Sequence, residues 1–224
     1  MCGRFTLQAP TDAILDLFDL EPEAAPPVIR PRYNVAPTQD VLALRVVEGE
    51  RELVRLHWGL VPFFMKDAKG AARMINARSE TVAEKPSFRA AFKRRRCLVP
   101  ADGFYEWRKT AAGGKQPFHI SMRDGRPFAF AGLWESWDKG PARLESCTIL
   151  TTTPNELVAE VHDRMPVILD PEDFPLWLDP GVTELGALRP LFEAHPADDM
   201  RVRAVSTRVN SPRNDDPACL EDAG

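Results

Sequence analysis

The sequence has little that would place it in a membrane or hold it together covalently. No apolar run approaches the ~20 residues of a membrane-spanning helix, and the N-terminus lacks the basic-then-apolar pattern of a signal peptide. No CxxC pair occurs, and the cysteines and histidines show no metal-ligand spacing, which argues against a disulfide scaffold and a zinc site. We therefore predict a cytoplasmic protein with reduced thiols, no membrane contact, no metal and no cofactor. The residues concerned are Cys2, Cys97, Cys147, Cys219, His57, His119, His162 and His195.

What is present is an ordinary globular composition. The 224 residues are 44% hydrophobic and 28% charged, which is enough for one sizeable core. We predict a single domain over residues 1–224 and a monomer.

Charge is unevenly distributed along the chain. The net charge is −4, but residues 64–96 carry ten Lys and Arg against three acids, whereas residues 156–199 carry eleven acids against two arginines. A local excess of positive charge favours contact with a phosphate backbone even on an acidic protein. The alternative for a run such as Lys93 to Arg96 is a solvated helix face.

Cys2 is the position with the most unusual chemistry. Removal of Met1 would leave it with an α-amino group of reference pKa ~7.7–8.0 and a thiol of ~8.5 that a neighbouring cation would lower. Amines and thiolates both attack carbonyls, and a 1,2-aminothiol closes an aldehyde into a five-membered thiazolidine. The alternative is that Cys2 is a small buried hydrophobe.

The pattern of short strands predicts an α+β fold with an antiparallel β-barrel-like core and peripheral helices. Residues 41–47 and 53–58 predict a hairpin around Glu48-Gly49-Glu50. Helices are expected from Thr11 as an N-cap, over 80–84 from Ser79, over 88–95, and from Thr153-Pro154.

Four further residues could carry chemistry. Glu106 stands between aromatic residues, where desolvation would raise its pKa, although it could instead point outward from an alternating strand. His162 is a candidate general acid or base, with a structural role as the alternative. Asn76 and Arg78 alternate on a predicted strand, where an amide could orient an amine and a guanidinium could bind phosphate.

An aromatic pair, Phe63-Phe64, lies beside Lys66 and Lys69. It could stack on bases, although aromatic pairs are more often part of a core.

Together these motifs resemble the SOS response-associated peptidase (SRAP) family, in order, from residue 2 to about residue 220. They are residues 1–5 (MCGRF), 33–37 (YNVAP), 58–62 (WGLVP), 75–81 (INARSET), 104–107 (FYEW), 162–166 (HDRMP), and the pairs Val205-Ser206 and Val209-Asn210.

The resemblance implies a protein that shields abasic sites in single-stranded DNA. Met1 is removed by autocatalytic peptidase action or by an aminopeptidase, and the new terminal cysteine crosslinks to the sugar aldehyde, with a lyase-type activity on DNA. Cys2 would be the nucleophile, Asn76 would orient its amine, Glu106 would transfer protons and His162 would assist sugar ring opening.

The same resemblance assigns DNA contacts, with Arg4 and Arg78 on the phosphates that flank the lesion. The family pattern has tryptophan where this chain has Phe64, which offers a smaller stacking area. The full set is Arg4, Asn34, Pro37, Phe64, Arg78, Arg89 and Thr151. The partner would be single-stranded DNA containing abasic sites, so the protein would be nucleoid-associated when bound.

Two other functions remain open from the residues. An N-terminal-nucleophile cysteine amidohydrolase or peptidase would use the same free Cys2 on an acyl substrate and would need an oxyanion hole. A non-covalent nucleic-acid reader would use only the basic segment and the phenylalanines.

Overall fold

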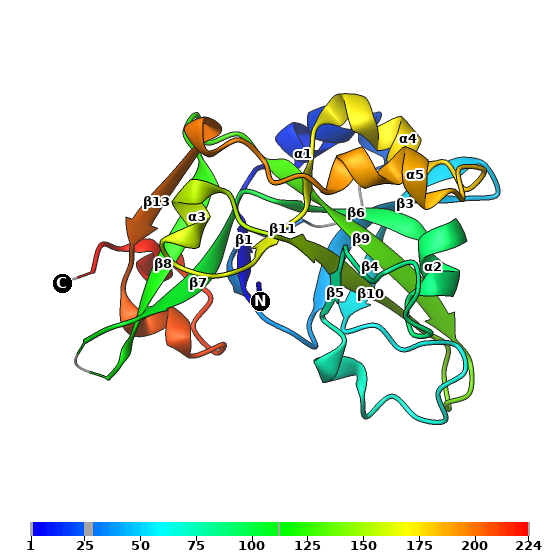
Figure 1. Ribbon diagram of the computed structural model, residues 1–224, viewed down its shortest axis with the longest axis horizontal. Helices are drawn as coiled ribbons and strands as arrows, with labels where there is room; N and C mark the ends of the chain where they lie inside the picture. Colours follow the sequence, from blue (N-terminus) through cyan, green and yellow to red (C-terminus); the bar gives the residue numbers. More distant parts are fainter. Residues whose placement is uncertain (1, 25–28, 112, 224) are drawn as a thin grey trace.

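Two sheets meet around the N-terminal strand in the computed structural model, which describes residues 2–24, 29–111 and 113–223 (Figure 1). The strands are β1 (Phe5–Leu7), β2 (Arg32–Val35), β3 (Asp40–Val47), β4 (Glu50–Trp58), β5 (Asn76–Arg78), β6 (Arg96–Ala101), β7 (Gly103–Lys109), β8 (Lys115–Met122), β9 (Phe128–Trp137), β10 (Leu144–Thr152), β11 (Met165–Pro166), β12 (Ile168–Leu169) and β13 (Met200–Ala204). The α-helices are α1 (Thr11–Phe18), α2 (Arg89–Arg94), α3 (Glu156–Ala159), α4 (Phe174–Leu178) and α5 (Leu185–Leu188).

The first sheet closes into a five-stranded barrel. Its strands follow the order β10-β4-β3-β6-β9, and β9 pairs again with β10, so the ring has no open edge. The short strands β5 and β11 add to β10, and β12 adds to β9. This confirms the predicted α+β class with a β-barrel core. One detail differs, because β10 runs parallel to both β4 and β5.

The second sheet has the order β13-β8-β7-β1-β2 and is antiparallel throughout. It stands beside the barrel in Figure 1, with the chain start between the two. Strand β1 lies between β7 and β2 and packs against the barrel, and Cys2 and Phe5 are therefore buried.

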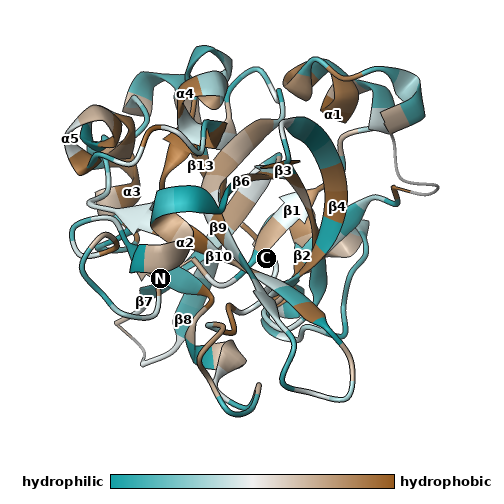
Figure 2. Ribbon diagram, turned by 90° about the vertical axis from the view of Figure 1, so that its right-hand side faces the viewer, coloured by the Kyte–Doolittle hydropathy of each residue, from teal (hydrophilic) through white to brown (hydrophobic). Residues whose placement is uncertain are grey.

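Both faces of the barrel strands are covered, so hydrophobic residues follow one another instead of alternating with polar ones. On β3, Val41 and Ala43 face the cluster that contains Cys2, whereas Leu42 and Leu44 face a second cluster. That second cluster includes apolar side chains from α1, α2, α4 and α5, which pack on the outside of the barrel. Strand β4 is less covered and carries both hydrophilic and hydrophobic residues, and its first two residues are exposed (Figure 2).

The predicted hairpin is confirmed, since Glu48 and Gly49 link β3 to β4 with φ values of 53° and 89°. Both values are left-handed, as the tight turn between two twisted strands requires. The predicted helix over 88–95 is confirmed as α2.

Three of the predicted helix starts were wrong. Residues 80–84 after Ser79 form turns and no helix. Thr11 is the first residue of α1 and not its cap, because Pro10 holds the N-cap position. Helix α3 begins at Glu156, two residues after the predicted first position at Pro154, because the Asn155 side chain caps it by accepting from the Val158 N–H.

None of the helices in the described residues is long and apolar enough to cross a membrane.

Candidate functional site

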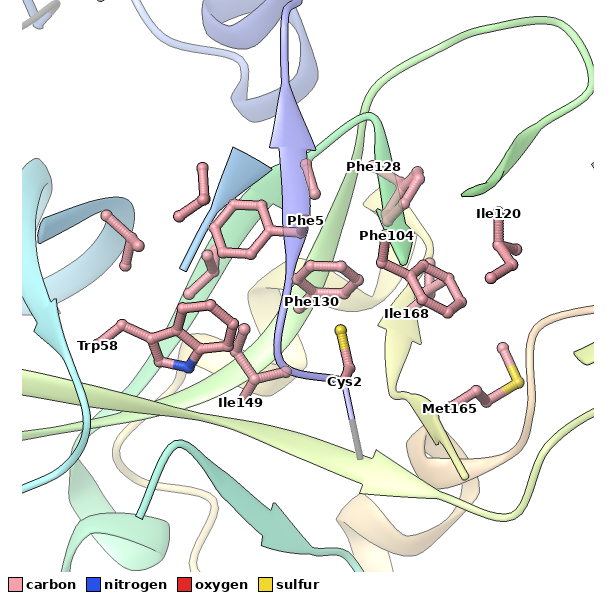
Figure 3. Packing of buried hydrophobic residues seen from close by; sticks show 14 of the residues in the cluster. Cys2, Phe5, Trp58, Phe104, Ile120, Phe128, Phe130, Ile149, Met165 and Ile168 are labelled. Atoms are coloured by element: carbon pink, nitrogen blue, oxygen red, sulfur yellow. The ribbon is translucent and has the colours of Figure 1, made fainter. Parts of the chain in front are cut away.

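Cys2 lies at the entrance to β1 and is fully buried. Its thiol points toward the Phe130 ring within the cluster that also holds Phe5, Trp58 and Met165 (Figure 3). The structure therefore agrees with the view of Cys2 as a buried small side chain, and neighbouring groups decide whether it is more than that.

The Cys2 thiol differs from expectation in its acidity. Burial raises its pKa, and the nearby carboxylate of Glu106 raises it further. The expected lowering of the thiol pKa by a neighbouring cation comes from the N-terminal ammonium, but burial and Glu106 outweigh it. Arg4 contributes no charge to the thiol, because it directs its guanidinium to Asn34 and Val209 and offers Cys2 only a backbone carbonyl, 3.7 Å from Sγ. The thiol is protonated at neutral pH.

Asn76 reaches Cys2 from the barrel. Strand β5 pairs in parallel with β10, with Asn76 opposite Ile149. This pairing places the Asn76 side chain next to Cys2. Its Nδ2 donates a hydrogen bond of 2.8 Å to the Cys2 carbonyl oxygen. Its Oδ1 is buried and has no hydrogen-bond partner among the described residues, so one acceptor beside Cys2 is available.

Glu106 enters from the second sheet. Phe104 and Glu106 share one face of β7, while Tyr105 between them packs in a separate cluster on the other face. Glu106 is only 3% exposed. Burial raises the pKa of its carboxyl to about 7, so the alternative that it points outward was wrong.

His162 follows α3 and lies beside Glu106, with 3.8 Å between His162 Nε2 and Glu106 Oε2. The Arg164 backbone N–H donates to His162 Nδ1 at 3.0 Å, which assigns the proton of the neutral ring to Nε2, on the side of Glu106. Burial lowers the pKa of His162. Once protonated, the ring would instead direct its Nδ1–H to Asp163, whose Oδ1 is 3.0 Å away.

These four residues form one cluster, which we call the Cys2 cluster: Cys2, Asn76, Glu106 and His162. They come from four separate parts of the chain and from both sheets. Of the expected catalytic residues, all four converge.

The expected DNA-contact residues are more dispersed. Arg78 and Arg89 are exposed, Pro37 is half-buried, and Thr151 is buried opposite Arg78 where β5 pairs with β10. Asn34 is fully buried, and all its polar side-chain atoms bind within the protein.

The basic segment is smaller at the surface than in the sequence. Arg96 is buried and donates to the carbonyls of Phe92 and Trp177, and Arg95 pairs with Glu135 at 2.7 Å. The other eight basic residues of the segment are exposed: Lys66, Lys69, Arg73, Arg78, Lys85, Arg89, Lys93 and Arg94.

Phe63 and Phe64 belong to the same surface. They are 50% and 43% exposed, and their rings meet edge to face with centroids 5.5 Å apart. Their exposure excludes the interpretation that the pair is part of the core, and leaves an exposed aromatic pair close in sequence to the exposed Lys66 and Lys69.

Sequence reasoning missed the residues that hold the site together. Arg164 binds both carboxylate oxygens of Glu80 and the Thr151 carbonyl, and so fastens the loop that carries His162 to the strand end after Asn76. The sequence places Arg164 two residues from His162, but nothing in it indicates that Glu80 is the partner.

No group of three or more candidate metal ligands occurs in the part of the chain that the structure describes.

A cysteine next to the chain start, facing an amide, a carboxylate and an imidazole at the junction of a barrel and a second sheet, defines a candidate N-terminal nucleophile site. The family model described as SOS response associated peptidase (SRAP) matches residues 1–212. The chain belongs to this family.

Named relatives cover nearly the whole chain. The abasic site processing protein YoqW of Bacillus subtilis is 44% identical over 222 residues, with 99% of each chain covered. The abasic site processing protein HMCES of Gallus gallus is 34% identical, over 89% of this chain and 64% of its own length. A crystal structure of a protein from Bacteroides thetaiotaomicron matches with a TM-score of 0.86 at 27% identity, covering 99% of this chain and 100% of that one.

Proposed function

We propose that this protein binds single-stranded DNA at abasic sites and, once Met1 is removed, forms a covalent thiazolidine crosslink through Cys2. The observation that carries the proposal is the convergence of Asn76, Glu106 and His162 on Cys2. The names of the relatives support the DNA lesion as the target, since an abasic deoxyribose opens to an aldehyde and a 1,2-aminothiol needs one.

The chemistry balances with the loss of one water. The free α-amine of Cys2 adds to the aldehyde carbon, and departure of the carbinolamine oxygen as water leaves an imine. The thiol sulfur then adds to the imine carbon, and its proton goes to the imine nitrogen. The product is a five-membered ring containing sulfur, nitrogen and the former aldehyde carbon.

The Cys2 cluster has a group for each proton transfer. With a pKa of about 7, the Glu106 carboxyl is present in both protonation states at neutral pH, so it can protonate the departing oxygen and accept the proton of the thiol. The thiol needs such a base because burial keeps it protonated. His162, with its Nε2–H on the side of Glu106, would protonate the sugar ring oxygen during opening.

Asn76 would orient the amine. Its Nδ2 binds the Cys2 carbonyl, and its buried Oδ1 is an acceptor for an amine N–H of Cys2. Both bonds together would set the direction in which the amine lone pair points.

The surface around the Cys2 cluster has the side chains needed to bind single-stranded DNA. Exposed lysines and arginines from the basic segment would bind phosphates, and Phe63 and Phe64 would stack on bases. Arg4, two residues after Cys2, and Arg78, two residues after Asn76 on β5, would bind the phosphates that flank the lesion.

The deciding experiment measures the intact mass of the protein before and after incubation with an oligonucleotide that carries one abasic site. We expect loss of Met1 and a mass gain equal to the oligonucleotide minus water. The matched control is the same oligonucleotide with an intact base, which should add nothing. An unchanged protein mass, with Met1 absent and the lesion intact, would refute the crosslink.

A second candidate is cysteine peptidase or amidohydrolase activity, which the family description favours. Met1 removal by the protein itself would be one instance of it. Purification with Met1 retained in a Glu106→Gln variant, but not in the wild type, from a host lacking methionine aminopeptidase activity would support self-removal. Met1 retention in both would assign the step to an aminopeptidase.

A further inference from the structure

The last part of the chain, residues 205–222, packs against β2 and β7 at the side of the second sheet away from the barrel (Figure 1). Val205, Val209 and Cys219 from this segment are buried against Tyr105. Trp107 Nε1 also donates to Asn210 Oδ1 at 2.7 Å. The segment is therefore tightly packed on the sheet that carries Arg4 and Glu106.

Asn34 is the centre of the polar contacts between this segment and β2. Its Nδ2 donates to the carbonyls of Val209, Ser211 and Asn214 at 3.1, 3.0 and 2.7 Å. Its Oδ1 accepts from Arg4 Nη1 at 3.0 Å. With every polar atom of the amide used and the side chain fully buried, Asn34 has nothing left with which to bind DNA.

Asp215 makes the second set of contacts. Its Oδ1 accepts from the backbone N–H groups of Tyr33 and Asn34 at 2.6 and 2.9 Å, and its Oδ2 pairs with Arg32. Asp215 thus fixes β2, the strand that carries Asn34. Asp215 lies beyond residue 212, where the match to the family model ends.

Arg4 is held by the residues that these two sets of contacts fix in place. Its Nη1 donates to Val209 O at 2.8 Å as well as to Asn34 Oδ1, and among the described residues these are its only side-chain hydrogen bonds. One edge of the guanidinium is therefore anchored, and the edge formed by Nε and Nη2 remains for a ligand. An arginine fixed in this way loses less rotamer entropy when it binds a phosphate.

We propose that Asn34 and Asp215 are positioning residues that fasten residues 205–222 to β2 and thereby hold the Arg4 guanidinium in place for a DNA phosphate beside the lesion. The inference rests on the proposed function, since it assumes that Arg4 binds the DNA backbone. It changes the expected role of Asn34 from direct contact to support of Arg4.

The test is a double-mutant cycle on affinity for an intact single-stranded oligonucleotide, measured by fluorescence anisotropy. Asn34→Leu should weaken binding roughly tenfold in the wild-type background, because one pre-organised phosphate contact is lost. In an Arg4→Gln background the same substitution should change the affinity by less than about twofold, since coupled residues are not additive. In the wild-type background, Asn34→Leu should also reduce the magnitude of the slope of log K against log salt by ~0.7, the value of one phosphate contact on a single strand.

Asp215→Asn provides a second variant that keeps its side-chain size. The substitution removes a negative charge, and this loss by itself should strengthen binding to DNA. A weaker affinity would therefore mean that the position of Arg4 has been disturbed. The control is Asp222→Asn in the same segment, which removes an equal charge from an exposed pair with Arg203 and should not weaken binding. Thermal melts establish that each variant is folded, and Asp215→Asn carries the cycle if Asn34→Leu does not fold.

If the wild type binds DNA, two results would overturn the inference. One is an equal loss of affinity for Asn34→Leu in the wild-type and Arg4→Gln backgrounds, and the other is no loss of affinity for either Asn34→Leu or Asp215→Asn. A wild type that binds intact single strands but forms no adduct with an abasic one would refute the crosslink alone. A wild type that binds no single-stranded DNA would refute both.

Discussion

The Cys2 cluster and the barrel strands β6 and β9 contain the same residue types in different surroundings. Cys2 and Cys97 are both fully buried in one apolar cluster, and burial raises the pKa of both thiols. Glu106 and Glu135 are 3% and 4% exposed. Glu135 is bound to Arg95, whereas Glu106 faces His162. Burial is therefore common to both regions, and the neighbours distinguish the candidate site.

The comparison of the two cysteines yields the largest expected effect. Cys2→Ala should abolish the adduct with abasic single-stranded DNA, because neither the ring sulfur nor a second thiol beside the amine remains. Cys97→Ala should leave the adduct unchanged and lower the free energy of unfolding by about 1 kcal/mol, as is common for a small buried truncation. Denaturing gel electrophoresis measures the adduct, and chemical unfolding measures the free energy of unfolding. Adduct formation by Cys2→Ala would remove Cys2 from the mechanism.

The two carboxylates should differ in rate. Glu106→Gln should slow crosslinking by about 10²- to 10⁴-fold, the usual contribution of a general acid or base. Glu135→Gln should keep the rate near wild type but lower stability by about 1–3 kcal/mol, because Arg95 loses its charged partner. Single-turnover kinetics on one abasic oligonucleotide tests both variants. Equal slowing by both would mean that Glu106 acts through the fold and not through proton transfer.

The raised pKa of Glu106 should also appear in stability. A carboxyl whose folded pKa, about 7, exceeds its ordinary value of 4.5 holds its proton more tightly in the folded state. Its contribution to the free energy of unfolding is therefore complete below pH 4.5 and is lost as the pH rises through about 7. The total loss corresponds to roughly 3 kcal/mol, and Glu106→Gln should not show it.

Urea unfolding of both proteins between pH 4 and pH 8 measures this difference. The wild type should lose stability relative to Glu106→Gln across that range. Parallel curves would mean that Glu106 does not hold its proton in the folded state.

The sequence alone supported the fold class and the main site residues, for reasons that particular elements make clear. Runs of apolar residues separated by turn signals such as Glu48-Gly49 are local features, and they correctly predicted the hairpin and a barrel-like core. The motifs around Cys2, Asn76, Glu106 and His162 are also short and contiguous. Helix starts were less predictable, since Ser79 has the right chemistry for a cap, yet residues 80–84 form turns.

Charge was the property for which counting in the sequence misled most. Arg95 and Arg96 contribute to the apparent basic run, but one pairs with Glu135 and the other lies buried among backbone carbonyls. Only the folded chain separates basic residues that can meet a phosphate from those that hold α2 and α4 to the barrel.

By itself, the sequence determined which groups are available: an aminothiol once Met1 is gone, an amide, a carboxylate and an imidazole, each in a recognisable local motif. Tertiary structure alone decided their properties. The pKa of Glu106, the approach of His162 to Glu106 and the hydrogen bonds of Arg4 to Asn34 and Val209 all depend on residues distant in the chain. Desolvation and hydrogen bonding act over a few ångströms of space, and a linear pattern records only neighbours along the backbone.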